Sequence, residues 1–156
     1  MRRMLVAGVG NIFLGDDGFG VEVANRLARE PLPQWVRVAD FGIRGIHLAY
    51  ELADGGYDTT VLVDAVPRGG PPGTVYLIEP DTEALAAGAQ ADAHTMTPEA
   101  VFAAVHALGG NPGRVLIVGC EPSGTEERMG LSEPVEQAVG EAVRLVRELI
   151  GREGRV

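Results

Sequence analysis

Residues 8–20 read GVGNIFLGDDGFG, a glycine-rich turn that begins within the last two residues of the apolar run Met4–Val9. A buried strand followed by such a turn and then by an amphipathic segment is typical of the start of a βαβ unit. The turn is close to the pattern of a phosphate-binding loop, but the G-x-G-x-x-G spacing would require glycine where Phe13 stands. Asp16 and Asp17 occupy the place of the anion, so the turn favours a hard cation or a proton as its guest.

The rest of the chain alternates strand and helix patterns. Strands are expected at Met4–Val9, Val36–Asp40, Thr59–Asp64, Thr74–Ile78 and Arg114–Gly119, with the fourth beside the third and antiparallel pairing plausible there. Helices are expected at Val21–Arg29, at Ile46–Ala53, from the N-cap Thr97 to Leu108 and from about Ser132 onward, with a long loop over residues 80–96. This order predicts an α/β fold, a three-layer αβα sandwich around a mostly parallel five-stranded sheet.

The composition predicts a soluble, single-domain protein spanning residues 1–156, with 46% apolar and 22% charged residues. No apolar run approaches the ~18 residues of a membrane span, and Met4–Val9 is too short for a signal segment. A lone cysteine, Cys120, allows no intrachain disulfide, in keeping with a reducing compartment. We therefore expect a cytoplasmic protein, and because its helix faces can all be satisfied within one domain we expect a monomer. The net charge of −9 argues against a nucleic-acid partner.

Acidic residues follow several of the expected strands. Asp17 follows the first strand, Asp40 and Asp64 end the second and third, and Glu121 follows the fifth. Ligands of parallel α/β sheets bind beyond the carboxyl ends of the strands, so these positions should share one edge. If the long loop folds back over that edge, His94 joins them and completes a nitrogen and oxygen ligand set suited to a divalent transition metal.

Each of these residues also has a purely structural interpretation. Asp17 could stabilise its own turn, and Asp40 could fix the tight turn into Gly42. Asp64 could cap a following helix, although no helical pattern follows it. His94 alone would ordinarily be a solvent-exposed loop residue. Two adjacent acids in an otherwise apolar turn favour the functional interpretation.

These motifs together resemble the hydrogenase maturation proteases, the endopeptidases that trim the C-terminus of the nickel-iron hydrogenase large subunit. The resemblance covers nearly the whole chain. It rests on the glycine-rich segments 8–11 and 15–20, on Val63–Ala65 at the third strand, on Pro72–Gly73 and on Ala93–His94.

The resemblance implies that Asp17, Asp64 and His94 contact metal and carry the catalysis. Many members have glutamate at the first of these positions, which leaves Asp16 as the alternative to Asp17. The segment DFGIRG, residues 40–45, matches an Asp-x-Gly-x-x-Gly element linked to recognition of a particular precursor. It implies recognition roles for Asp40, Gly42 and Arg44.

The reaction implied is a single cut that removes the C-terminal extension of a nickel-loaded large-subunit precursor. The nickel would be carried by the precursor. Two carboxylates a few ångströms apart cannot both ionise easily, so one could serve as general base on water; a metal-bound water is the competing account. The chain has no G-x-S-x-G elbow, and no histidine lies near Cys120 in sequence, which disfavours a serine or cysteine nucleophile.

Two other functions share some of these features. A non-catalytic nickel-binding accessory protein of hydrogenase assembly would use the same ligands and release an uncut precursor. A nucleotide-binding domain is suggested only by the glycines at positions 8 and 10. The charged loop Gly124–Gly130 either faces solvent or touches the precursor.

Overall fold

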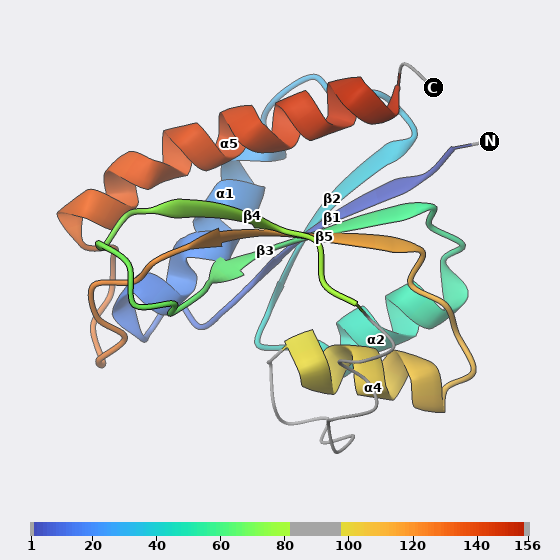
Figure 1. The fold of residues 1–156 in the computed structure, drawn as a ribbon, viewed down its shortest axis with the longest axis horizontal. Helices are drawn as coiled ribbons and strands as arrows, with labels where there is room; N and C mark the ends of the chain where they lie inside the picture. Colours follow the sequence, from blue (N-terminus) through green and yellow to red (C-terminus); the bar gives the residue numbers. More distant parts are fainter. Residues whose placement is uncertain (1, 82–97, 155–156) are drawn as a thin grey trace.

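The computed structural model describes residues 2–81 and 98–154, and they form a single five-stranded sheet with helices on both faces (Figure 1). The strands are β1 (Met4–Val9), β2 (Val36–Gly42), β3 (Thr59–Ala65), β4 (Val75–Ile78) and β5 (Arg114–Cys120). Their order across the sheet is β2-β1-β3-β5-β4. β1 pairs in parallel with β2 and β3, and β3 with β5, whereas β4 is antiparallel to β5. The mostly parallel sheet expected from the sequence is confirmed.

The placement of β4 beside β3 was wrong, because β5 lies between them. β5 is buried from its second residue to its last, whereas every residue of β4 is at least partly exposed. A strand that is buried on both faces belongs in the middle of a parallel sheet, and the short, partly exposed strand takes the edge. The antiparallel direction of β4 itself is confirmed.

Helices cover the two faces of the sheet and complete three layers (Figure 1). α1 (Phe19–Leu27) and α5 (Glu133–Glu153) pack on one face, and α2 (Gly45–Asp54) and α4 (Pro98–Ala107) on the other. The first core contains Phe19 of α1 and Val139 of α5, the second Leu48 of α2 and Phe102 of α4. The sheet is thus buried on both sides, which accounts for its continuous apolar strands.

The element boundaries differ from the expected ones by one or two residues in most cases. β2, β3 and β5 each run one or two residues longer, and a 3-10 turn, η1 (Gly15–Gly18), precedes an α1 that begins earlier and ends earlier than expected. The proposed N-cap at Thr97 and most of the loop 80–96 lie outside the described residues.

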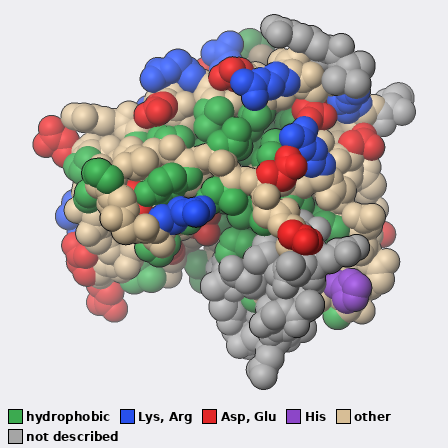
Figure 2. Space-filling view, viewed as in Figure 1, with side chains coloured by type: hydrophobic (Ala, Val, Ile, Leu, Met, Phe, Trp, Pro, Cys, Tyr) green, Lys and Arg blue, Asp and Glu red, His purple; other side chains and the backbone are tan. Residues whose placement is uncertain are grey.

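The outer surface of α5 carries interspersed acidic and basic side chains (Figure 2). Arg152 pairs with Glu148 within the helix at 2.8 Å, and Arg147 reaches Glu30 at 3.4 Å. Exposed pairs of this kind contribute little to stability, so the buried stripe of α5 holds the helix on the sheet. Within the described part of the chain, no helix combines the length and the apolar character needed to cross a bilayer.

Candidate active site

Asp17 and Asp64 come together at the carboxyl end of the central strands. Asp64 is the penultimate residue of β3, and Asp17 lies in η1, which packs against β3. The Oδ2 atom of Asp17 accepts a hydrogen bond from the backbone N–H of Asn11 at 2.7 Å. Oδ1 of Asp64 accepts one from the N–H of Ala65 at 2.8 Å. Both carboxylates are only partly buried, so a substrate can approach them.

Two glycines let the turn fold this closely onto the sheet. Gly10 has a φ of +137°, and a Cβ atom there would collide with the carbonyl oxygen of Asp17. At Gly20, in the first turn of α1, a Cβ would collide with the carbonyl oxygens of Val63 and Val9. Any side chain at these positions would push η1 away from β3. The glycine pattern of residues 8–20 is therefore what brings Asp17 next to Asp64.

The environment of Asp64 disfavours its charged form. Burial raises the pKa of Asp64 to about 8, the negative charge of Asp17 adds to the rise, and the hydrogen bond from Ala65 opposes it only in part. Two neighbouring carboxyl groups in a poorly solvated site hold one proton between them near neutral pH. Asp64 carries that proton up to about pH 8. A cation or a substrate that binds at the pair could displace it.

Asp16 points away from this pair and is fully engaged in hydrogen bonds. Only 1% exposed, its carboxylate accepts from the N–H groups of Ser123 (2.7 Å), Gly124 (3.1 Å) and Ser132 (2.7 Å) and from the Ser132 hydroxyl (2.8 Å). Burial alone would raise the pKa of Asp16, but these hydrogen bonds outweigh it and hold the pKa below its usual value. These hydrogen bonds give Asp16 a structural task, and Asp17 is the first-loop acid whose charge raises the pKa of Asp64.

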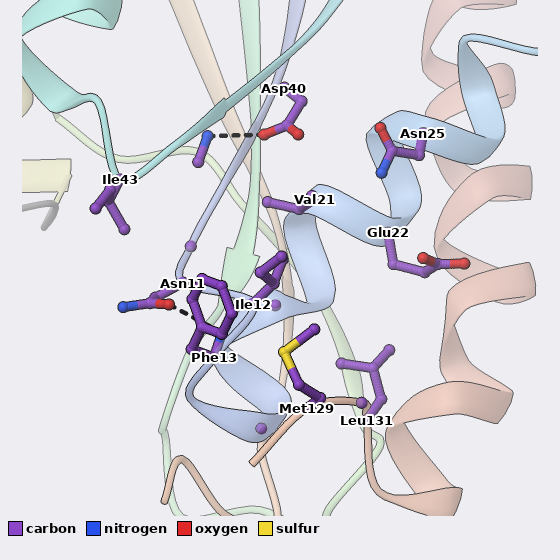
Figure 3. A pocket seen from close by; sticks show the side chains of 15 residues that line it. Asn11, Ile12, Phe13, Val21, Glu22, Asn25, Asp40, Ile43, Met129 and Leu131 are labelled. Atoms are coloured by element: carbon purple, nitrogen blue, oxygen red, sulfur yellow. Dashed lines mark hydrogen bonds between the residues drawn. The ribbon is translucent and has the colours of Figure 1, made fainter. Parts of the chain in front are cut away.

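Asp40 and Gly42 form the tight turn at the end of β2. Oδ1 of Asp40 accepts from the N–H of Gly42 at 2.8 Å, and Gly42 has a φ of +52°. The guanidinium of Arg44 folds back and donates to the carbonyl oxygens of Asp40 (2.6 Å) and Phe41 (3.2 Å). Asp40 is exposed, and it lies across a cavity from the glycine-rich loop (Figure 3). The turn-forming interpretation of Asp40 is thus compatible with a recognition role, since its second oxygen faces outward.

The remaining residues at this edge have structural partners. Burial raises the pKa of the Cys120 thiol to about 12, and the charges of Asp16 and Glu121 add to the rise, so Cys120 is a poor nucleophile. Oε1 of Glu121 accepts hydrogen bonds from the N–H groups of Arg68 and Gly70 and from the Tyr76 hydroxyl. Glu121 therefore anchors the loop between β3 and β4.

His94 lies outside the described residues, so its place relative to Asp17 and Asp64 is not defined. Among the residues that the structure does describe, no three His, Cys, Asp or Glu side chains are grouped closely enough to hold a metal ion. The described part of the site is thus a carboxylate pair. A metal ion bound there would need further ligands from elsewhere.

Sequence reasoning missed a cavity whose lining includes the glycine-rich turn but neither Asp17 nor Asp64. It measures about 520 Å³, and apolar side chains on three separate loops line it, with α1 as a further wall (Figure 3). The available signal was in the glycine-rich turn itself, where Ile12 and Phe13 interrupt a run of small and polar residues. Large apolar side chains in an exposed turn are often part of a binding surface.

Comparison with known proteins agrees with this architecture. The model of the hydrogenase maturation protease family matches residues 21–149. The hydrogenase expression/formation protein HupD of Rhodobacter capsulatus is 33% identical over 153 residues, covering 94% of this chain and 72% of the relative. A putative hydrogenase maturation protease of Methanocaldococcus jannaschii is 33% identical over 150 residues, covering 93% and 94% of the two chains. The solved hydrogenase maturating endopeptidase HybD from E. coli superposes with a TM-score of 0.81 at 29% identity, covering 97% of this chain and 94% of that one.

Proposed function

This chain belongs to the hydrogenase maturation protease family, and from that premise we propose that it removes the C-terminal extension of a nickel-loaded nickel-iron hydrogenase large-subunit precursor. The observation that carries the proposal is the pair of Asp17 and Asp64, two partly buried carboxylates held together at the carboxyl end of a parallel sheet. Such a pair can bind a divalent cation or move a proton, the two abilities that a nickel-dependent peptide cleavage requires.

The nickel in this proposal arrives with the precursor. Asp17 and Asp64 supply carboxylate oxygens, and we propose His94 as the imidazole ligand because of its place in the sequence. A nickel ion that keeps its precursor ligands needs only a few open positions filled by the protease, so three side chains suffice. Contact between the carboxylates and the ion would place the scissile peptide beside them and restrict cleavage to loaded precursors.

Two chemical routes are open to the carboxylates once the precursor is bound. In the first, Asp17 takes a proton from the attacking water while protonated Asp64 donates to the carbonyl oxygen of the peptide. When the adduct collapses and the C–N bond breaks, Asp17 gives its proton to the leaving amine nitrogen and Asp64 takes back the proton from the carbonyl oxygen. In the second, both carboxylates bind the nickel, which lowers the pKa of a water molecule for attack. The first route needs the Asp64 proton, and the second requires its loss.

The pH dependence of single-turnover cleavage separates these routes. If protonated Asp64 is the acid, the rate falls as the pH rises through about 8, where Asp64 loses its proton. If both carboxylates bind nickel, the rate rises over the same interval, because protons no longer compete with the ion. The measurement is cleavage at saturating protease from pH 6 to 9, with the nickel content of the precursor checked at each pH.

The proposal as a whole is tested by intact mass. A large-subunit precursor from the same source is incubated with the chain in nickel-loaded and nickel-free forms, and its mass is followed over time. We expect one C-terminal fragment to be lost from the loaded form only. Loss from both forms would contradict nickel sensing, and fragments from several sites would contradict a processing enzyme.

The same experiment tests the accessory-protein alternative. An accessory protein would form a complex with the loaded precursor and leave its mass unchanged. The complex is measured by size-exclusion chromatography in parallel with the mass, so binding without cleavage is recognised directly. That outcome would replace the protease with a nickel-binding assembly factor.

A further inference from the structure

The loop between β3 and β4 carries an arginine a short distance along the chain from the carboxylate pair. The loop leaves β3 after Ala65 and returns to the sheet at Val75, so it lies at the end of the sheet where Asp64 is found (Figure 1). Arg68 lies on this loop, four residues after Asp64, and is exposed. No residue of the loop lines the cavity of Figure 3, so Arg68 belongs to a different part of the surface.

Arg68 and Asp64 lie on the same face of the sheet. Side chains alternate between the two faces along a strand. Leu62 of β3 belongs to the core under α2 and α4, so Asp64, two residues further on, points to that face. Ile78 of β4 belongs to the same core, and Tyr76 points to that face for the same reason. The guanidinium carbon of Arg68 lies 5.7 Å from the centre of the Tyr76 ring, in a cation–π contact, so Arg68 is on this face as well.

The strand register gives the separation between Asp64 and the ring that supports Arg68. Asp64 pairs with Gly119 of β5, and Gly119 pairs with Tyr76. Neighbouring strands lie ~4.8 Å apart, so the backbones of Asp64 and Tyr76 are separated by roughly 10 Å. Gly119 contributes no side chain between them, and the Val66 side chain packs over it. An extended peptide covers such a distance in about three residues, so a peptide bound at Asp64 can reach Arg68.

A buried glutamate fixes the backbone that carries Arg68. Glu121 is only 5% exposed, and its Oε1 atom accepts hydrogen bonds from the N–H groups of Arg68 (2.8 Å) and Gly70 (3.0 Å) and from the Tyr76 hydroxyl (2.8 Å). One carboxylate oxygen thus holds both the loop and the ring on which the guanidinium rests. Because the arginine is held in place before a partner arrives, binding costs less conformational entropy.

The guanidinium of Arg68 has no anionic partner within the described part of the chain. The side chain contacts the Tyr76 ring, and the backbone N–H donates to Glu121. The ion pairs of the described residues involve other arginines, namely Arg26, Arg37, Arg114, Arg147 and Arg152. The planar guanidinium matches a carboxylate with two parallel hydrogen bonds. Arg68 therefore presents a carboxylate-binding group on the same face as Asp64.

From these observations we infer that Arg68 binds a carboxylate of the C-terminal extension of the precursor, about three residues beyond the scissile bond. The inference rests on the proposed function, because it takes the occupant to be the chain presented to Asp17 and Asp64. The carboxylate belongs either to an Asp or Glu side chain of the extension or to its terminal residue, since every extension ends in a carboxylate. Glu121 and Tyr76 are positioning residues that hold Arg68 in place.

Kinetics provides the first test. In Arg68→Gln we expect the KM for the loaded precursor to rise about fivefold or more, because a charge-assisted contact is lost. The kcat should change less than about twofold, since the contact is made equally in the bound precursor and in the transition state. The matched control is Arg144→Gln, which removes the same charge from an exposed position on α5. Equal KM values for the two variants would overturn the inference.

Altered precursors identify the source of the carboxylate. In one precursor every Asp and Glu of the extension is replaced by Asn or Gln, and in another a Gly-Ser-Gly segment added at the end displaces the terminal carboxylate. If a side chain is the partner, the first precursor raises the KM of the unaltered chain and has no further effect on Arg68→Gln. If the terminal residue is the partner, the second precursor does so. A KM of the unaltered chain that is the same for both altered precursors and the natural one would overturn the inference.

A binding measurement separates failure of this contact from failure of the proposed function. The Kd of the complex with the loaded precursor is measured by biolayer interferometry in an Asp17→Asn background, for Arg68→Gln and for Arg144→Gln. If the unaltered chain leaves the precursor intact but Arg68→Gln alone raises the Kd, the contact stands and the protease assignment fails. If cleavage occurs and Arg68→Gln changes neither KM nor Kd, the protease assignment stands and the inference about Arg68 fails.

Discussion

Asp16 and Asp17 are neighbours in the same 3-10 turn, and their carboxylates lie in opposite environments. The carboxylate of Asp16 is buried and accepts four hydrogen bonds from the loop before α5. That of Asp17 is partly exposed and accepts one hydrogen bond from Asn11, and its charge raises the pKa of Asp64. An aspartate carboxylate thus stabilises the fold at position 16, and at position 17 it disfavours a second negative charge, on Asp64.

The contrast shows how binding capacity arises in a small α/β protein. A carboxylate with every acceptor site filled contributes to folding and has nothing left for a ligand. A carboxylate pair with few donors is costly to the fold, and a cation or a proton relieves that cost. If this contrast is correct, removing each acid should change the cleavage rate and the unfolding free energy in a different way.

Asp17→Asn should give the largest effect, on activity alone. Loss of one carboxylate from the pair should slow precursor cleavage by at least about 100-fold, the usual contribution of a positioned acid or base. The unfolding free energy should change by less than about 1 kcal/mol, because one hydrogen bond to Asn11 is replaced by a similar one. Mass spectrometry of the precursor and urea unfolding measure the two quantities, and cleavage at the wild-type rate would remove Asp17 from the site.

Asp16→Ala should have the reverse signature. It leaves the buried donors of Ser123, Gly124 and Ser132 without an acceptor, and we expect the unfolding free energy to fall by about 3 kcal/mol at pH 7. Because the folded pKa of Asp16 is lowered, its stabilising contribution is present above the unfolded pKa and is lost as the pH falls through the folded value.

Urea unfolding at pH 7 and at pH 3 checks this prediction. The difference between the wild type and the Asp16→Ala variant should narrow at the lower pH. The conservative control is Ser132→Ala, which removes one donor and leaves the Asp16 carboxylate in place. A loss below about 1 kcal/mol in Asp16→Ala at pH 7 would mean that water replaces the missing acceptor and that the loop is not held by Asp16.

Asp64→Asn should stabilise the protein while it abolishes cleavage. The folded pKa of Asp64, about 8, lies above the unfolded value, so the folded state binds the proton more tightly and wild-type stability falls as the pH rises between the two values. Removing the charge should therefore raise the unfolding free energy at pH 8, by at most about 5 kcal/mol for a pKa difference of about 4 units, with the gain shrinking toward pH 4. Thermal unfolding from pH 4 to 8 measures this, and a gain independent of pH would contradict the raised pKa.

Much of this architecture could be predicted from the sequence. The periodicity of apolar residues and the positions of turn residues located all five strands. The alternation of strands and helices placed Asp17 and Asp64 at one edge of the sheet. Both signals are local along the chain. The position of β4 could not be predicted from its own residues. It depends on β5, which is buried on both faces and therefore takes the central position beside β3.

The role of Asp16 was also hidden from the sequence. Its partners lie 107 to 116 residues away, and nothing in the local pattern distinguishes it from Asp17. The cavity lined by Phe13 and Met129 could not be predicted for the same reason, since its walls meet only when the loop before α5 is hydrogen-bonded to the glycine-rich turn. Local sequence patterns predict helices and strands well, whereas the different roles of two adjacent residues depend on contacts that form only in the folded chain.

The smallest expected effect is a change in the pKa of Asp64 in the Asp17→Asn variant. It is the most sensitive test of the contrast between Asp16 and Asp17. Burial is the largest cause of the raised value and the Asp17 charge the second, so removal of that charge should lower the Asp64 pKa and leave it above the ordinary aspartate range. Carbon NMR of the labelled Asp64 carboxyl follows this titration, with Asp40→Asn as a control that removes a charge at the end of β2. If the pKa returned fully to its ordinary value, the two carboxylates would act as a coupled pair, and burial would have little part. If it did not move, Asp17 and Asp64 would be too far apart to share a proton or a cation, and the contrast between Asp16 and Asp17 would be one of hydrogen bonding alone.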